Sequence, residues 1–384
     1  MGTPAARMSA GFAVVSAQGV VELWRAAAAD AATAQVILAR ASSRAGAHAA
    51  ALPVLEVAHA QSPQDEPLLA DLRTADPGRR PLPAAGTSDG RLGWTVPVFA
   101  SYDGTEIGYR VVGDGPPLVC LPGGPGRAAG YLGDLGGVSR SRQLILLDPR
   151  GVGLSADPAD PATLRVDLLV RDVDALRAHL GLERMDLLAH SAGAVLATLY
   201  AAAHPDRLSR LILVTPGLAA VGVGPTGEQV RAALARRSAE PWYPAALTAM
   251  EKFIAGDLSA ETFEASRPFF YARWDDASQA HATAGIAPRH AAARQGFFAG
   301  APFDAPSTRA ALKELNAPVL LYAGDLDPIA TPAVVRVAAP LFNDATIVVQ
   351  PQVAHFPWVD DPAAFAAAIR SLPRLTAAAS AIPR

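Results

Sequence analysis

Residues 185–197 read MDLLAHSAGAVLA, an apolar run that leads directly into a serine flanked by small residues. Met185–Ala189 is apolar except for Asp186, as expected of a buried strand, and Ala192–Ala203 has the composition of a helix. A serine on such a sharp strand-to-helix turn is forced out of the sheet edge, with its oxygen exposed above the N-terminus of the helix. The segment therefore predicts that Ser191 is a nucleophile.

Apolar runs and helical patterns alternate along the chain on both sides of this turn. We expect buried strands at Pro117–Leu121, Gln143–Leu147, Leu208–Val214, Val319–Ala323 and Thr346–Val349. We expect helices at Asp167–Leu180, Pro332–Ala339 and Pro362–Arg370. Two further runs, Trp94–Ala100 and Thr105–Val112, predict a hairpin. This alternation predicts an α/β fold with a mostly parallel sheet flanked by helices.

A nucleophilic hydroxyl needs a base and an acid that orients the base. In folds of this kind the chain order is serine, acid, histidine. Residues 346–357 (TIVVQPQVAHFP) are a strand and then a loop that carries His355, the predicted base. Residues 319–328 (VLLYAGDLDP) end in a loop that offers the acid. Asp327 is preferred because the acid usually comes three residues after the loop glycine, and Asp325 stays as the alternative.

Two other histidines lie near the predicted nucleophile in the sequence. His190 adjoins Ser191, but we expect its side chain to point away along the turn. His204 lies at the end of the following helix, where a capping role is expected. Chain order, spacing and loop position favour His355 over both.

A glycine- and proline-rich loop, PGGPG at residues 122–126, directly follows the expected strand Pro117–Leu121. Glycines let a backbone approach a reacting carbonyl closely, and prolines stiffen the loop. Backbone N–H groups in such a loop can stabilise the negative charge that develops on the carbonyl oxygen. We predict that the two donors of this oxyanion hole are Gly124 and Ala192, the residue after the predicted nucleophile.

Together these motifs resemble those of the α/β-hydrolase superfamily, and most closely its proline iminopeptidase-like branch. That branch carries His-Gly-Gly-Pro-Gly after the third strand, where this chain reads PGGPG at 122–126. It also carries Asp-x-Arg-Gly-x-Gly-x-Ser, matched by DPRGVGLS at 148–155. The ending HFPW at 355–358 is typical of the loop of the catalytic histidine in the superfamily. The resemblance covers about residues 95–216 and 307–372, and implies an α/β-hydrolase fold.

Three positions depart from the pattern of that branch. Pro122 replaces the loop histidine, so we expect the oxyanion hole to be braced differently. Ala189 replaces the first glycine of the nucleophile turn and adds a single methyl group. Ala192 replaces the tryptophan that follows the nucleophile in peptidases of the branch, which weakens the inference to an aminopeptidase. In those peptidases cap carboxylates bind the free amino group of the substrate, and the candidates here are Glu251, Glu261, Glu264, Asp275 and Asp276.

Changes in composition divide the chain into four segments. Residues 1–90 are Ala-rich and end in a Pro- and Gly-rich linker, which predicts a helical N-terminal extension. Residues 91–216 and 307–384 are the two parts of the α/β core. Residues 217–306 lack the strand–helix alternation and predict an inserted helical cap. Aromatic side chains of the cap would supply apolar walls for a substrate, and the candidates are Phe269, Phe270, Trp274 and Phe297. The alternative for most of them is burial in the cap's own core.

The composition excludes several kinds of partner. The chain has 384 residues, of which 51% are hydrophobic, and a formal net charge of −3. This charge offers no electrostatic footprint for nucleic acid or an anionic membrane, and no apolar run has the length of a membrane span. The single cysteine, Cys120, excludes an intramolecular disulfide and a cysteine-based zinc site. We expect a cytoplasmic protein with no cofactor or metal, and the N-terminal extension could form a homo-oligomer contact.

The combined expectations describe a serine hydrolase that cleaves a small ester, amide or aminoacyl substrate through an acyl-enzyme. Ser191, His355 and Asp327 would carry out the reaction. The same residues would also support acyl transfer, if the pocket excludes water and admits another acceptor, or hydrolytic carbon–carbon bond cleavage. An alternative that is not an enzyme is a binding protein built on a hydrolase scaffold. The presence of Ser191, His355 and Asp327 together argues against it.

Overall fold

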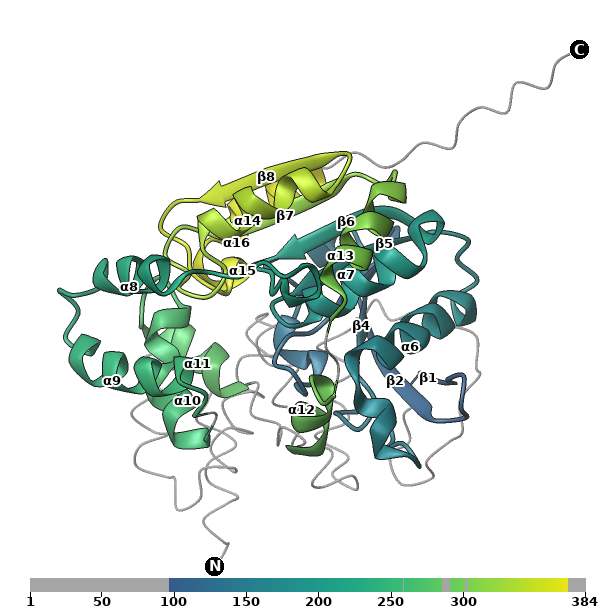
Figure 1. The fold of residues 1–384 in the computed structure, drawn as a ribbon, viewed down its shortest axis with the longest axis horizontal. Coiled ribbons are helices and arrows are strands. Elements are labelled where there is room, and N and C mark those ends of the chain that lie inside the picture. The colour runs from purple at the N-terminus through teal and green to yellow at the C-terminus, as the bar shows by residue number, and fades with distance from the viewer. Residues whose placement is uncertain (1–96, 258, 285–290, 301–302, 372–384) are drawn as a thin grey trace, which may run out of the picture. The chain divides into compact units, whose positions relative to one another are not determined.

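The strands predicted from the apolar runs form one sheet. They are β1 (Val98–Ala100), β2 (Glu106–Val112), β3 (Pro117–Leu121), β4 (Gln143–Leu147), β5 (Met185–His190), β6 (Leu208–Val214), β7 (Val319–Gly324) and β8 (Ala345–Gln350). Their order across the sheet is β1-β2-β4-β3-β5-β6-β7-β8 (Figure 1). The pairs β1–β2 and β2–β4 are antiparallel, and all other neighbours in this sheet are parallel. The predicted α/β fold with a mostly parallel sheet is confirmed.

The computed structural model describes residues 97–257, 259–284, 291–300 and 303–371. The helical extension predicted at residues 1–90 therefore lies outside the described residues. The helices next to the sheet are α6 (Val166–His179), α7 (Gly193–Ala203), α13 (Ala305–Ala311), α14 (Pro332–Ala338), α15 (Pro357–Asp360) and α16 (Pro362–Ser371). Among the described helices none is long and apolar enough to cross a membrane.

Both faces of the central strands β3 to β7 are buried, which explains why these strands are largely apolar. Successive strand residues point to opposite faces. Val119 and Leu121 of β3 belong to an apolar cluster that contains buried side chains of α6, α7 and α14. Leu118 and Cys120 belong to a second cluster, with buried side chains of α15 and α16. Cys120 is thus a packing residue, and burial raises the pKa of its thiol, which disfavours the nucleophilic thiolate.

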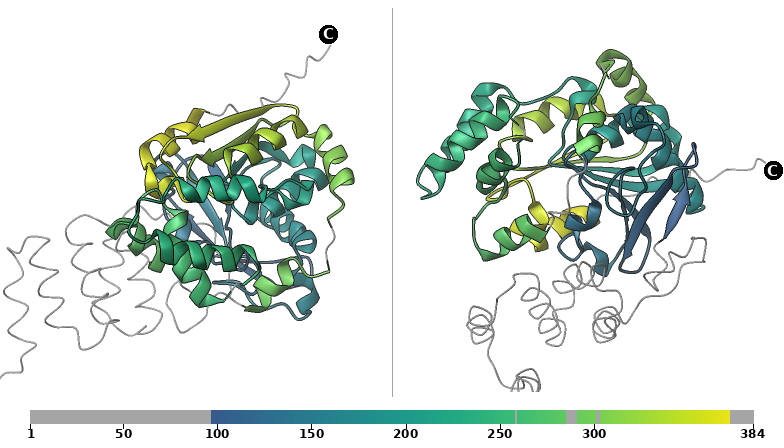
Figure 2. Two further views of the ribbon diagram at one scale, coloured as in Figure 1. Left: turned by 60° about the vertical axis from the view of Figure 1, so that its left-hand side comes forward. Right: turned by 90° about the horizontal axis from the view of Figure 1, so that it is seen from below.

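A helical insertion separates β6 from β7 in the chain. Its helices are α8 (Gly227–Ala235), α9 (Tyr243–Ile254), α10 (Ala260–Ser266), α11 (Asp276–Ala284) and α12 (Ala291–Phe297). In Figure 1, α8 to α11 gather beyond the arrowheads of β6 and β8, and Figure 2 shows them from two further directions. In an open parallel sheet, ligands bind outside the carboxyl ends of the strands. We call residues 217–306 the cap, with these bounds kept as a prediction.

The DPRGVGLS segment, which contributed to the family resemblance, ties the loop after β3 to the sheet. The Asp148 carboxylate accepts hydrogen bonds from Ala129 N (2.6 Å) and Leu154 N (2.8 Å). It also forms a 2.9 Å ion pair with Arg110 of β2. Because Asp148 is fully buried, losing any of these partners would leave part of a buried charge unsatisfied. The motif therefore acts here as a scaffold for the loop at 122–129.

Candidate active site

Ser191 occupies the sharp turn between β5 and α7 that the sequence predicts. Its φ angle is +53°, a left-handed conformation that non-glycine residues rarely adopt. The turn is tightly packed, because a Cβ added at Gly193 would overlap the carbonyl oxygen of Pro122. A Cβ at Gly123 would lie only 2.8 Å from the Cβ of Ser191. The buried methyl group of Ala189 is accommodated in the core below the turn.

Three side chains from distant parts of the chain form one hydrogen-bonded series. His355 Nε2 lies 2.9 Å from Ser191 Oγ, and His355 Nδ1 lies 2.7 Å from Asp327 Oδ2. The other carboxylate oxygen of Asp327 accepts hydrogen bonds from Ile329 N (2.8 Å) and Ala330 N (3.1 Å). Asp327 is fully buried, so these bonds hold its carboxylate in one orientation.

The two aspartates of the loop after β7 have different partners. Asp325 Oδ1 accepts a hydrogen bond from Gln352 N (2.7 Å), and Oδ2 forms a 2.8 Å ion pair with Arg236 of the cap. Its main-chain oxygen also accepts a hydrogen bond from Arg236. Asp325 therefore braces the loop against the cap, and Asp327 is the aspartate in contact with His355.

Gly124 and Ala192, the predicted oxyanion donors, lie on the two loops that meet at Ser191. Gly124 is exposed and Ala192 is partly exposed. Among the described residues, neither N–H donates a hydrogen bond to a protein acceptor. Ala192 is also the N-cap residue of α7, where the helix dipole favours negative charge. Both amides are thus available to an incoming group.

The predicted oxyanion loop, residues 122–126, is braced by a tyrosine and a histidine. Gly123 N donates to the Tyr131 hydroxyl oxygen (2.7 Å), and that hydroxyl lies 2.6 Å from His190 Nδ1. His190 Nε2 lies 3.0 Å from the main-chain oxygen of His355. A carbonyl oxygen only accepts, so His190 carries its proton on Nε2, and Nδ1 accepts the Tyr131 proton. One chain of hydrogen bonds therefore links the oxyanion loop to the main chain of His355.

Burial, and then the neighbouring His355, hold the pKa of His190 well below its ordinary value, so its imidazole is neutral. The expectation that the His190 side chain points away along the turn is incomplete. The side chain does not replace His355 as the partner of Ser191 Oγ. It turns into the core between Tyr131 and Trp358 and braces two loops. No local pattern in the sequence indicates this role, because the partners of His190 are 59 and 165 positions away.

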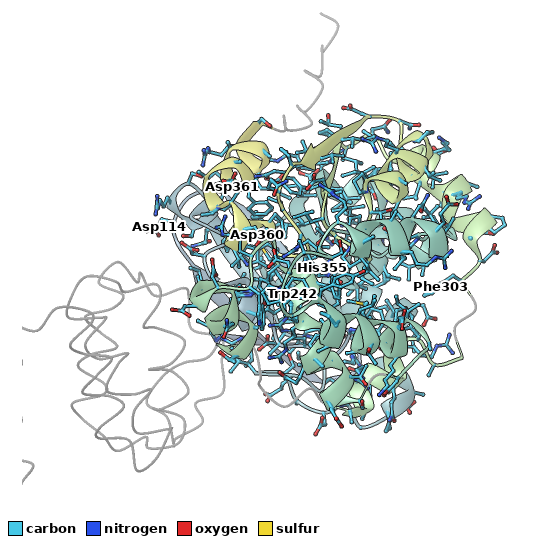
Figure 3. All side chains as sticks on the ribbon, turned by 90° about the vertical axis from the view of Figure 1, so that its left-hand side faces the viewer. Asp114, Trp242, Phe303, His355, Asp360 and Asp361 are labelled. Atoms are coloured by element: carbon cyan, nitrogen blue, oxygen red, sulfur yellow. The ribbon has the colours of Figure 1, made fainter. Side chains whose placement is uncertain are left out.

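The cap touches the loop of His355 directly. His355 N donates to the main-chain oxygen of Phe270 (3.0 Å), and the two rings lie 5.4 Å apart between centroids. Asp360 accepts hydrogen bonds from Ala354 N (2.8 Å) and from Ala272 N of the cap (2.9 Å). Burial raises the pKa of Asp360 to about 6. Figure 3 labels His355 and Asp360 close to this junction.

A cap histidine makes a second junction, with the segment that follows the oxyanion loop. His281 Nε2 donates to the main-chain oxygen of Tyr131 (2.9 Å), and the Tyr271 hydroxyl donates to His281 Nδ1 (2.9 Å). Burial, and then Arg127, lower the pKa of His281 to about 4. The cap is therefore hydrogen-bonded both to the loop of His355 and to the segment that follows the loop at 122–126.

The four aromatic residues predicted to line a substrate pocket occupy different environments. Phe269 is buried against Trp242 (5.0 Å between centroids), which Figure 3 labels below His355, and against Tyr243. Trp274 packs on Tyr271. Phe297 is buried in the cluster that contains β3 and α7, so it does not group with the other three. Only Phe270 of the four touches His355.

The five cap carboxylates considered as amino-group ligands are all exposed: Glu251, Glu261, Glu264, Asp275 and Asp276. Glu264 pairs with Arg267, and Asp275 pairs with Arg273. Within the described ranges, no group of three or more His, Cys, Asp or Glu side chains is arranged to hold a metal ion.

The sheet order and the turn that carries Ser191 are those of a known family. Residues 116–362 match the family described as alpha/beta hydrolase fold. This match covers more than half of the chain, so the chain belongs to the α/β-hydrolase family.

Within the family, the chain lies close to the proline iminopeptidases. It is 28% identical over 276 residues to the proline iminopeptidase of Levilactobacillus brevis, covering 67% of this chain and 90% of that protein. It is 39% identical over 117 residues to the enzyme of Lactobacillus helveticus strain DPC 4571, covering 29% of this chain and 40% of that protein. The chain thus spans about 40% of the length of this more identical relative. The crystal structure of proline iminopeptidase from Mycobacterium smegmatis shares the fold, with a TM-score of 0.54 at 21% identity, over 71% of this chain and 96% of that one.

Proposed function

We propose that the protein is a cofactor-independent serine hydrolase that cleaves a small ester, amide or aminoacyl substrate through an acyl-enzyme. The observation that carries this proposal is the hydrogen-bonded series Ser191–His355–Asp327 at a strained turn. These three residues are separated by up to 164 positions in the chain. A hydroxyl, an imidazole and a buried carboxylate in this order are the groups needed for nucleophilic catalysis.

The geometry defines the proton movements of this mechanism. Asp327 accepts the Nδ1 proton of His355, which leaves the lone pair of Nε2 to receive the proton of Ser191. As Ser191 Oγ attacks the acyl carbonyl, His355 becomes charged and the buried carboxylate of Asp327 stabilises that charge. His355 then returns the proton to the leaving group, and water releases the acyl group by the reverse sequence.

Gly124 N and Ala192 N are the proposed donors to the oxyanion. Gly124 is exposed, and its position after β3 puts it on the loop whose neighbouring Gly123 packs against Ser191. The chain of hydrogen bonds through Tyr131 and His190 supports this loop in place of the histidine that the related branch carries at position 122. An oxyanion hole held in advance lowers the barrier because no reorganisation is needed during the reaction.

Within this range of substrates, an ester or amide is favoured over an aminoacyl substrate with a free amino group, such as a peptide with an N-terminal proline. The five cap carboxylates named above are exposed, and Glu264 and Asp275 already pair with arginines. Ala192 also stands where the peptidases of the branch have tryptophan. Both observations argue against a site that binds a cationic amino group.

A fluorophosphonate probe tests the nucleophile. It is expected to label the wild type and not Ser191→Ala, because only the activated serine reacts at neutral pH. Absence of labelling in correctly folded wild-type protein would overturn the proposal and favour a non-catalytic binding protein. Turnover of p-nitrophenyl acetate in preference to proline β-naphthylamide is expected, and the reverse preference would indicate an aminopeptidase.

A further inference from the structure

Arg127, directly after the loop at 122–126, is a buried cation that pairs with no carboxylate among the described residues. Seven arginines are buried in the described part of the chain: Arg127, Arg142, Arg150, Arg177, Arg210, Arg237 and Arg267. All of these except Arg127 have a carboxylate oxygen within 4.0 Å. Arg127 is only 8% exposed, and its Nε is a buried donor with no acceptor. Among the described residues Arg127 has no ion pair and no hydrogen bond from its side chain.

The guanidinium of Arg127 lies between the two loops that carry the reacting groups. Its central carbon is 3.6 Å from the centroid of the Tyr131 ring, and the hydroxyl of that ring holds the amide of Gly123. The same carbon is 5.9 Å from the centroid of Phe356, the residue after His355. The Cβ of Arg127 is 3.0 Å from the position that a Cβ at Gly124 would occupy. The cation therefore lies against Tyr131 and Phe356, one from each of the two segments beside the candidate active site.

Within the described ranges, no acidic side chain acts on this charge. Arg267, a second cation, acts on Arg127 by repulsion, and the hydroxyl groups of Tyr131 and Tyr271 also lie near it. Arg127 in turn lowers the pKa of His190 and His281, so both imidazoles stay neutral beside it. Arginine remains protonated at neutral pH even when it is buried. A buried charge of this kind is costly unless an anion pairs with it.

We propose that Arg127 binds a carboxylate group of the substrate, so that the preferred substrates are esters or amides that carry a second, free carboxylate. This inference rests on the proposed acyl hydrolysis at Ser191. The planar guanidinium fork matches a carboxylate with two parallel hydrogen bonds, and its terminal nitrogens make none within the described residues. The same charge repels a substrate with a cationic amino group, which agrees with the exposed position of the cap carboxylates.

Paired chromogenic esters test the proposal. Mono-p-nitrophenyl glutarate and p-nitrophenyl pentanoate have acyl chains of equal length, ending in a carboxylate and in a methyl group respectively. The ratio of kcat/KM for the glutarate ester to that for the pentanoate ester is expected to fall about 10- to 100-fold in Arg127→Met. Arg127→Lys keeps the positive charge but loses the planar guanidinium. Its ratio of kcat/KM values is expected to lie between those of the wild type and Arg127→Met. The same comparison is made with the mono-p-nitrophenyl esters of succinate and adipate, each paired with the uncharged ester of equal chain length. These esters place the free carboxylate one methylene nearer to, or farther from, the acyl carbonyl.

Arg237→Met is the matched control, because Arg237 is similarly buried and also lies over an aromatic ring, that of Trp242. The ratio of kcat/KM for the glutarate ester to that for the pentanoate ester is expected to be the same in Arg237→Met as in the wild type. That result would show that losing a buried arginine from the packing does not by itself change the ratio. An unchanged ratio in Arg127→Met, for all three chain lengths, would overturn the proposal.

A titration that needs no catalysis separates this proposal from the proposed function. Glutarate is added to Ser191→Ala and to the double variant Ser191→Ala/Arg127→Met, with binding measured by calorimetry at constant ionic strength. Binding by the first protein only supports the carboxylate site whether or not esters are hydrolysed. Equal binding by both proteins, or binding by neither, overturns it. Failure of Ser191 to react with the fluorophosphonate probe instead overturns the proposed function alone.

Discussion

Replacement of Tyr131 by phenylalanine removes one oxygen atom from the brace behind the oxyanion loop. Two buried groups lose their partner at once: Gly123 N, now 2.7 Å from the hydroxyl, and His190 Nδ1, now 2.6 Å from it. His190 is 2% exposed, so water does not replace the lost partner easily. A buried polar group left unsatisfied costs about 1–3 kcal/mol. The expected loss is therefore about 2–6 kcal/mol in the free energy of unfolding.

The same substitution is expected to lower activity as well as stability. Without the hydroxyl, the amide of Gly123 has no acceptor and the loop that carries Gly124 can shift. Misplacement of a catalytic donor by about 1 Å costs on the order of 100-fold in rate. We expect kcat for p-nitrophenyl acetate to fall about 10- to 100-fold with a smaller change in KM, because the oxyanion forms only during the reaction.

The free energy of unfolding is measured by urea denaturation, with tryptophan fluorescence as the signal. The values of kcat and KM are measured by steady-state kinetics without urea. Tyr200→Phe is the control, because the Tyr200 hydroxyl donates to Asp174 of α6 (3.0 Å), which is not part of the brace. That variant is expected to lose about 1 kcal/mol and to keep its kcat. If Tyr131→Phe has the same free energy of unfolding and the same kcat as the wild type, the Tyr131 hydroxyl does not hold the loop at 122–126 in place.

Three further predictions concern the cap, the acid and the turn. Burial lowers the pKa of His281 to about 4 in the folded chain, whereas in the unfolded chain this imidazole binds a proton below about pH 6.5. The contribution of the neutral imidazole to the free energy of unfolding is therefore complete above pH 6.5 and decreases as the pH falls to 4. Between pH 7 and pH 4 the wild type should lose about 3 kcal/mol more than His281→Gln in urea unfolding, and parallel losses would contradict this. Asp327→Asn should lower kcat about 10⁴-fold and Asp325→Asn only a few-fold, whereas the reverse result would make Asp325 the acid. Gly193→Ala should destabilise by about 1–3 kcal/mol, because its methyl group overlaps a carbonyl oxygen, while Gly130→Ala, with no atom closer than 3.9 Å, should stay near the wild type in the same assay.

The order of strands and helices follows from the sequence because its signals are local. Apolar runs of the length of a strand alternate with helical spacing, and the predicted strand Leu208–Val214 has the bounds observed for β6. The turn at Ser191 is also a local signal, since small residues on both sides permit its left-handed backbone. The candidate residues His355 and Asp327 were predicted from their position in loops after late strands, and the fold brings them within hydrogen-bond distance of each other.

The tertiary structure alone decided which polar groups meet in the interior. Asp325 and Asp327 are two positions apart in one loop, and only the fold places Arg236 of the cap beside the first and His355 of the loop after β8 beside the second. The brace through Tyr131 and the unpaired charge of Arg127 have no sequence signal, because tyrosines and arginines are more often exposed or paired. Burial removes water as an alternative partner, so the role of such a residue depends on which distant segments the fold places around it.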